Sequence, residues 1–160
     1  MLTIPSSIAA KLDPDFVTAL YAALGPLPAT YVGTRGVPPA GQQAALYARH
    51  LADPTFDAAP PGHSAHEEHP TVVGAPRAGL ALDFGVEEAD GSLTYHDGTD
   101  GQPLDPRWQA AWDAIKASPD LHSGHSFPED TGGKVPCDND HVEDLRWRHV
   151  RAFLQANGQW

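Results

Sequence analysis

The clearest element in the sequence is the stretch Ala78-Gly79-Leu80-Ala81-Leu82-Asp83-Phe84-Gly85-Val86. Large apolar residues alternate there with small or acidic ones, which is the two-residue period of a half-buried β-strand. One face is therefore predicted to join the core, and it carries Leu80, Leu82, Phe84 and Val86. On the other face Asp83 stands among glycine and alanine, which leaves room for a ligand on its carboxylate. This strand is predicted to be central to the fold and to carry a site.

Two histidines elsewhere in the chain are candidates to join Asp83 in a metal site. His66 belongs to the loop before the strand, and His141 follows the acidic stretch that begins at Asp138. Two imidazoles and a carboxylate are three of the four ligands of a catalytic zinc, and the fourth position is left for water. The remaining carboxylate, Asp138, is the kind of group that accepts a proton from such a water. The sequence therefore predicts one Zn²⁺ per chain.

The composition is that of a globular protein with an acidic surface. Of the 160 residues, 41% are hydrophobic and 19% are charged, and we expect a single domain over residues 1–160. The formal net charge of −11 argues against nucleic acid or an anionic membrane as a partner, because both attract clustered Lys and Arg. The single cysteine, Cys137, excludes an internal disulfide bond. We expect a monomer.

The N-terminus lacks the features of a targeting segment. Met1-Leu2-Thr3-Ile4-Pro5 has neither the charged start nor the hydrophobic core of a signal peptide, and no apolar run reaches the length of a membrane span. We therefore expect the protein to be made in the cytoplasm without a signal peptide. A substrate outside the membrane would require another agent to release the protein.

Capping residues and apolar spacing predict four helices. Asp13-Pro14 and Asp105-Pro106 are strong helix starts, because the aspartate caps the helix and the proline has no N–H that needs a partner. The other helices are expected at about Ala40–Leu51 and after His141, ending near Asn157-Gly158. Further strands are expected at Ala29–Gly33 and Gly91–His96, and irregular chain at Ala52–Arg77 and Leu121–Pro136. The predicted fold is α+β, a small, mainly antiparallel sheet with the site on one face and helices packed on the other.

Four segments of the chain resemble, in order, the motifs of one known family. They are Gly33-Thr34-Arg35 with Gln43, Leu46 and Tyr47 after it, Pro61-Gly62-His63-Ser64-Ala65-His66, Gly79-Leu80-Ala81-Leu82-Asp83-Phe84, and Asp138-Asn139-Asp140-His141-Val142-Glu143. The family is that of the zinc D-alanyl-D-alanine carboxypeptidases and L-alanyl-D-glutamate endopeptidases of peptidoglycan, which are similar in fold to the hedgehog signalling domain. Each motif alone is weak, and their common order makes the resemblance specific.

The chain also departs from the family pattern. The family places its first histidine closer to the aspartate, so Glu67–Ala78 would hold an insertion. His69 lies in that insertion and could compete as a ligand. Thr34 replaces an aromatic residue, and Asp140 replaces the usual proline or aromatic residue before the last histidine. These departures bear on substrate preference more than on metal binding.

The resemblance implies a role for each candidate residue. His66, Asp83 and His141 would hold the zinc, with water in the open position. Asp138 would act as the general base, taking a proton from that water and returning it to the leaving amine. Arg35 would bind a substrate carboxylate or the developing oxyanion.

Plainer interpretations of the same residues stay open at this point. Ser64 would hydrogen-bond the substrate or orient His66, and Arg35 could simply pair with a surface acid. His122 and His125 are expected to be structural or merely near the site. Three further alternatives are a solvent-facing Asp83, a loose surface metal tract of His63, His66 and His69, and a helix cap by Asp138 beside an exposed His141.

The resemblance implies a zinc peptidase that acts on the stem peptides of bacterial peptidoglycan. Cleavage of the L-Ala–D-Glu bond, as by phage endolysins, fits this chain best, with action on the cell wall after release by a holin or by lysis. A D,D-carboxypeptidase that releases D-Ala is the second candidate. Two other classes are a non-catalytic wall-binding or phage structural module that keeps the fold, and a histidine-rich metal-buffering protein.

Overall fold

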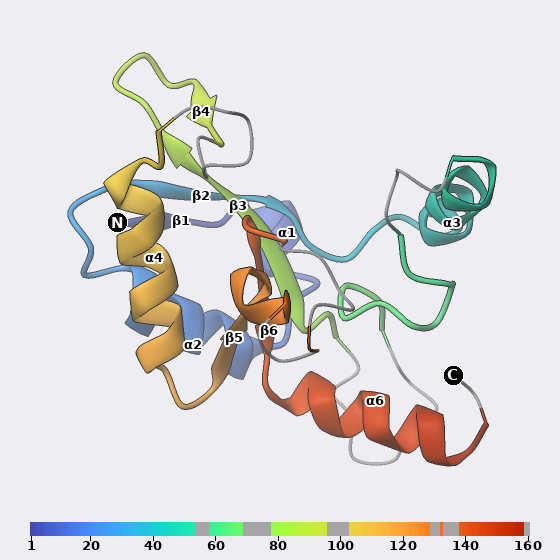
Figure 1. Ribbon diagram of the computed structural model, residues 1–160. Helices are drawn as coiled ribbons and strands as arrows, with labels where there is room; N and C mark the ends of the chain where they lie inside the picture. Colours follow the sequence, from blue (N-terminus) through green and yellow to red (C-terminus); the bar gives the residue numbers. More distant parts are fainter. Residues whose placement is uncertain (54–57, 69–77, 96–102, 129–131, 133–137, 159–160) are drawn as a thin grey trace.

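The computed structural model describes residues 1–53, 58–68, 78–95, 103–128, 132 and 138–158. Helices and strands are interspersed along the chain (Figure 1). In order they are β1 (Leu2–Thr3), α1 (Ser6–Ala9), α2 (Pro14–Leu24), β2 (Tyr31–Arg35), α3 (Gln42–Ala52), β3 (Ala81–Glu87), β4 (Leu93–Thr94), α4 (Pro106–Ala117), β5 (Leu121–Ser123), the 3-10 helix η1 (Gly124–Ser126), β6 (His141–Asp144) and α6 (Arg146–Ala156).

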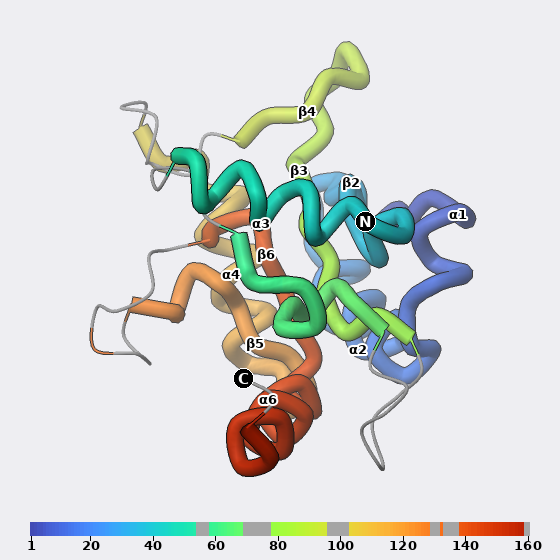
Figure 2. The backbone as a smooth tube through the Cα atoms, turned by 90° about the vertical axis from the view of Figure 1, so that its right-hand side faces the viewer, coloured from blue at the N-terminus to red at the C-terminus, as the bar shows by residue number. Residues whose placement is uncertain are grey.

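The strands form one six-stranded sheet in the order β1-β2-β3-β6-β5, and β4 pairs with β3. Only the β1–β2 pair is parallel among the described strands, so the predicted mainly antiparallel α+β fold is confirmed. The strand predicted around Asp83 is β3, and it is paired on both sides. The turned view shows α3 and α6 in front of the sheet and α2 and α4 behind it (Figure 2).

The main core lies between the sheet and the helices α2 and α4. Leu82, Phe84 and Val86 of β3 are fully buried there, as the alternation of the strand predicts. Each such side chain contributes roughly 1.5–3 kcal/mol through burial. Both helices begin at the predicted capping aspartates, whose carboxylates accept backbone N–H bonds. The buried helix residues are Phe16, Leu20, Leu24, Trp108, Ala111, Trp112 and Ile115.

A second apolar cluster fixes α6 against the chain that leads into β3. Trp147, Val150 and Leu154 of α6 pack there with Ala65, Leu80 and Ala81. The prediction that Leu80 shares a core face with Leu82 was therefore wrong, because Leu80 precedes β3 and turns to this cluster.

Two segments were assigned the wrong secondary structure from the sequence. The final helix was expected to begin directly after His141, but Val142 belongs to β6, and α6 begins only at Arg146. Leu121–Ser123, expected to be irregular, forms β5 beside β6. All four residues of β6 are buried although only Val142 is apolar, and so short a polar strand has no period in the sequence that could separate it from a helix. No helix in the described part of the chain is long and apolar enough to cross a bilayer.

Candidate metal centre

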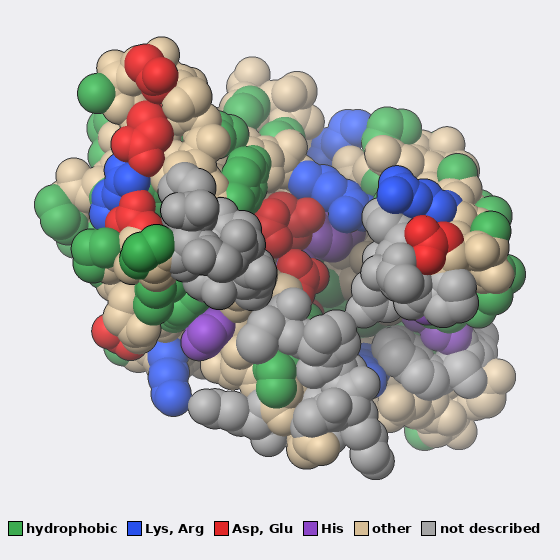
Figure 3. Space-filling model, turned by 45° about the horizontal axis from the view of Figure 1, so that its top comes forward, with side chains coloured by type: hydrophobic (Ala, Val, Ile, Leu, Met, Phe, Trp, Pro, Cys, Tyr) green, Lys and Arg blue, Asp and Glu red, His purple; other side chains and the backbone are tan. Residues whose placement is uncertain are grey.

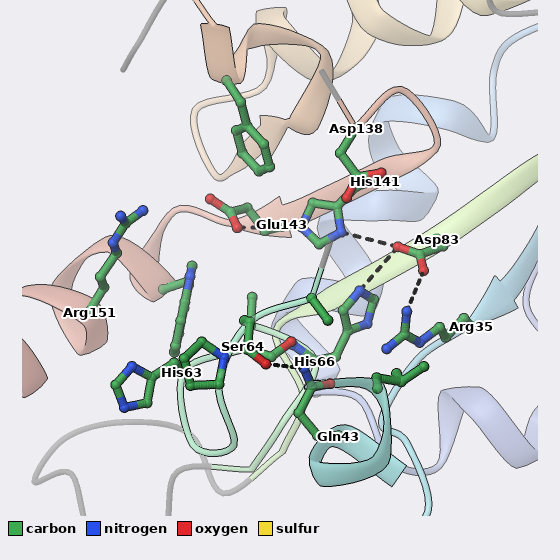
Figure 4. A pocket seen from close by; sticks show the side chains of 17 residues that line it. Arg35, Gln43, His63, Ser64, His66, Asp83, Asp138, His141, Glu143 and Arg151 are labelled. Atoms are coloured by element: carbon green, nitrogen blue, oxygen red, sulfur yellow. Dashed lines mark hydrogen bonds and ion pairs between the residues drawn. The ribbon is translucent and has the colours of Figure 1, made fainter. Parts of the chain in front are cut away.

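The register of β3 and β6 brings two of the predicted ligands together. Asp83 lies directly opposite His141, and His141 Nδ1 is 3.1 Å from Asp83 Oδ1. His66 reaches the same oxygen from the loop before β3, with its Nε2 also 3.1 Å from Asp83 Oδ1. One donor atom from each of the three side chains lies within 4.8 Å of the other two. Figure 4 shows them converging on one point.

The three donors fit a zinc ion in type and spacing. Nitrogen and oxygen ligands lie about 2.0–2.1 Å from zinc, and a tetrahedral arrangement of them puts neighbouring donors roughly 3.3 Å apart. The two 3.1 Å separations to Asp83 Oδ1 are close to that value. His66 and His141 are 5% and 6% exposed, so little water competes for their ring nitrogens.

The electrostatics around Asp83 favour a cation. Burial raises the pKa of Asp83, but the adjacent His66 and His141 imidazoles outweigh it and hold the pKa well below its usual value. Burial alone would lower the pKa of His141, but hydrogen bonds to Asp83 and Glu143 outweigh burial and hold the pKa well above its usual value. Burial and repulsion from Asp83 and Asp138 raise the pKa of Asp140 to about 7. The negative charges of Asp83 and Asp138 are thus felt by a third carboxyl group, and a divalent ion bound nearby would reduce this repulsion.

The loop that carries His66 is held by its own polar groups. The Ser64 hydroxyl accepts a hydrogen bond from the His66 backbone N–H at 3.3 Å. Glu67 Oε2 accepts bonds from the N–H groups of Gly62 and Ser64, at 2.8 and 3.2 Å. The Ala65 carbonyl accepts from the N–H of Leu80 and ties the loop to β3. Ser64 therefore has the orienting geometry that was one of its two predicted roles, and it also lines the pocket.

A bulge in β2 places Arg35 beside Asp83. Gly33 pairs with Phe84 on the core side, and the register then slips so that Arg35, rather than Thr34, lies opposite Asp83. A bulge of this kind moves the next side chain to the other face of the strand. Arg35 Nη1 lies 3.7 Å from Asp83 Oδ2. Its buried Nε has no hydrogen-bond partner within the described residues, which leaves that donor for a ligand.

Asp138 lies at the edge of the same site. It is exposed, lines the pocket and stands beside His141 in Figure 4. Its backbone N–H donates to the Gly124 carbonyl at 3.2 Å, and its own carbonyl accepts from the N–H of His141 at 3.2 Å. The backbone of η1 therefore sets the position of Asp138.

Substitution Gly124→Ala tests this positioning. An added β-carbon would lie 2.3 Å from the Asp138 carbonyl oxygen and 3.0 Å from the β-carbon of His141. The backbone from Asp138 to His141 must shift, so we expect a loss of about 1–3 kcal/mol in unfolding free energy and weaker zinc binding. Thermal unfolding and zinc titration measure the two effects. Gly85→Ala, whose β-carbon would meet only side-chain atoms at 3.3 Å, should change neither by as much.

His66, Asp83 and His141, here called the three-residue metal group, line a pocket of about 420 Å³. Figure 3 shows acidic, basic and histidine side chains gathered around a hollow in one face of the molecule. Several residues that line the pocket have no role that was predicted from the sequence: Gln43, Phe127, Glu143, Trp147 and Arg151. Gln43 is 5% exposed, and its Nε2 donates to the Ala59 carbonyl at 2.7 Å. Its buried Oε1 has no partner within the described residues.

The other histidines considered as possible members of the site take different places in the chain. His63 lines the pocket but does not belong to the three-residue metal group. His125 stacks on Trp112, with ring centroids 3.7 Å apart, and its Nδ1 lies 2.7 Å from Asn139 Oδ1. The structural role expected for His125 agrees with these contacts. His69 and Cys137 lie outside the described residues.

Comparisons with known proteins support the fold. No family model matches the chain, and no curated protein sequence matches it. Among solved structures, the chain is similar to the L-Ala D-Glu endopeptidase ChiX of Serratia marcescens. The TM-score is 0.55 at 16% sequence identity, and the match covers 91% of this chain and 88% of that one. At this identity the likeness shows that the chain has the fold of that peptidase.

Proposed function

We propose that this protein is a zinc-dependent peptidase that hydrolyses the L-Ala–D-Glu bond in the stem peptides of peptidoglycan. The observation that carries the proposal is the meeting of His66 Nε2, Asp83 Oδ1 and His141 Nδ1 in an open pocket. The fold supports it, because a solved structure with a similar fold is an L-Ala D-Glu endopeptidase. A zinc ion held there would supply an acidified water and polarise the scissile carbonyl.

The protein side chains divide the remaining work. Asp138 is exposed on the pocket wall, where it takes the proton of the attacking water and returns it to the leaving amine. Arg35, whose Nε has no partner among the described residues, stabilises the negative charge that develops on the carbonyl oxygen. The Arg35 guanidinium is suited to this role because it keeps its charge and offers several donors in a fixed plane.

The pocket also offers an acceptor for the substrate backbone. Gln43 is held by its hydrogen bond to Ala59, so its Oε1, which no described residue contacts as a donor, has a fixed position in the wall. A substrate N–H that reaches this oxygen would repair a buried unsatisfied acceptor, which is worth about 1–3 kcal/mol. Gln43 would therefore accept a hydrogen bond from the peptide and Arg35 would donate one, and together they would orient it.

Digestion of purified peptidoglycan tests the proposal. The zinc-loaded protein should release fragments with a new N-terminal D-Glu, identified by mass spectrometry, and elemental analysis should find one zinc per chain. The Asp138→Ala protein is the control for contaminating hydrolases.

The other outcomes each point to a different function. Release of D-Ala alone would replace the proposal by a D,D-carboxypeptidase. One bound zinc with no fragments from any wall would indicate a non-catalytic module that keeps the fold. Several metal ions per chain, bound outside the three-residue group, would indicate a metal-buffering protein.

A further inference from the structure

The sheet aligns a second histidine and a second carboxylate with His141. His141 and Glu143 are two residues apart on β6, so their side chains project from the same face. Asp83 lies directly opposite His141 on β3, and His122 lies directly opposite Glu143 on β5. The four side chains therefore form two facing pairs across three adjacent strands.

Close polar contacts connect these side chains into a row. Glu143 Oε2 lies 3.4 Å from Nε2 of His141, the ring nitrogen that faces away from Asp83. The other carboxylate oxygen, Oε1, lies 3.1 Å from His122 Nδ1. Glu143 is 6% exposed, and both of its oxygens are thus engaged by imidazoles. The row runs from Asp83 through His141 and Glu143 to His122.

An aromatic ring covers the row. The centroid of the Phe127 ring lies 5.4 Å from that of His122 and 5.7 Å from that of His141. The His122 side chain is 12% exposed and that of Glu143 8%. Hydrogen bonds shielded from water in this way are stronger and more directional than exposed ones.

The two histidines of the metal group are held by different means. His66 Nδ1 is buried and has no hydrogen-bond partner within the described residues, so its ring is placed by the loop backbone. The His141 ring has a carboxylate on each side, Asp83 at Nδ1 and Glu143 at Nε2. A half-turn of this ring about the Cβ–Cγ bond would put a ring carbon where Nδ1 now faces Asp83 and would take Nε2 away from Glu143, so the Glu143 contact opposes that turn.

We propose that Glu143 and His122 are positioning residues that fix the His141 ring so that Nδ1, and not Nε2, binds the metal. Glu143 accepts the Nε2–H bond of His141, and His122 donates to the second oxygen of Glu143 and keeps the carboxylate in line. Partners of this kind set the orientation of a ligating histidine and typically change metal affinity 10- to 100-fold. This inference rests on the proposed metal site but not on the substrate.

Paired substitutions test the roles of Glu143 and His122. Glu143→Leu should raise the zinc dissociation constant by about 10- to 100-fold, measured by competition with a chelator. Glu143→Gln, whose amide can accept from His141 and donate to His122, should restore most of the affinity. His122→Ala should weaken zinc binding about tenfold, whereas His122→Asn, whose amide nitrogen replaces Nδ1, should not. The matched control is His149→Ala, which removes an exposed histidine on α6 and should leave zinc affinity unchanged.

The ring nitrogens can be observed directly. In ¹⁵N NMR spectra of the zinc-loaded protein, His141 should show a protonated Nε2 and a metal-bound Nδ1, and His66 a metal-bound Nε2. Zinc on Nε2 of His141 would overturn the inference. So would an unchanged zinc affinity in a folded Glu143→Leu protein. If Glu143→Leu does not fold, the His122 variants and the wild-type spectrum decide the question.

The same measurements separate this inference from the proposed function. A wild-type protein that binds zinc through His141 Nδ1 but cleaves no wall would refute the peptidase and leave the positioning roles in place. If the wild-type protein cleaves the L-Ala–D-Glu bond while the Glu143 and His122 variants bind zinc normally, the peptidase stands and the positioning roles are refuted.

Discussion

Asp138→Ala is expected to lower the kcat for peptidoglycan hydrolysis by about 10²- to 10⁴-fold and to leave one zinc bound per chain. The Asp138 side chain is exposed on the pocket wall and does not belong to the three-residue metal group. Its removal therefore takes away a proton acceptor without removing a metal ligand. Digestion rates and zinc titration of the same preparation measure the two properties separately.

The matched variant for this prediction is Asp138→Asn, which keeps the shape of the side chain and removes its basicity. It should be as inactive as Asp138→Ala, because the amide cannot take a proton from water. Both proteins should unfold within about 0.5 kcal/mol of the wild type, as expected for an exposed side chain. Hydrolysis near the wild-type rate in either variant would show that another group is the base.

The elements with a clear hydrophobic period were predictable from the sequence. The alternation around Asp83 predicts β3 and its core face, and the pairs Asp13-Pro14 and Asp105-Pro106 predict the starts of α2 and α4. The short strands β1 and β5 have two and three residues, too few for any period to be seen. β6 has only four residues, of which Val142 alone is apolar, so Val142 was taken for part of the helix that follows.

The three candidate metal ligands were predictable because their residue types indicate a zinc site. The residues around them were not, because their positions depend on the pairing between strands. The residue types at His66, Asp83 and His141 indicate a zinc site, and the structure brings their donor atoms together. The position of Arg35 depends on a bulge, which the sequence does not reveal. The contact of Glu143 with His122 depends on the β5–β6 register, and β5 was not predicted.

Asp83→Ala is expected to have the largest effect on zinc binding, because Asp83 Oδ1 is the one atom that lies 3.1 Å from both imidazole donors. Four-ligand zinc sites bind with about 10–16 kcal/mol, or roughly 3 kcal/mol per ligand, so losing this carboxylate should weaken zinc binding more than a hundredfold. The change also leaves His66, His141 and Arg35 close together without the negative charge they share. Hydrolysis should therefore be lost along with the metal, unlike in Asp138→Ala.

The stability of the protein without zinc gives this last prediction a second measurement. His66 and His141 lower the pKa of Asp83, and Asp83 and Glu143 raise the pKa of His141. The charged pair therefore stabilises the folded protein around neutral pH, and this contribution is lost as the pH falls through the lowered pKa of Asp83 or rises through the raised pKa of His141. Asp83→Ala should lower the zinc-free unfolding free energy around neutral pH. The matched control is Asp113→Asn on the exposed face of α4, where the amide oxygen can keep the bond from Gln109. Tight zinc binding by folded Asp83→Ala would mean that the metal is held elsewhere in the protein.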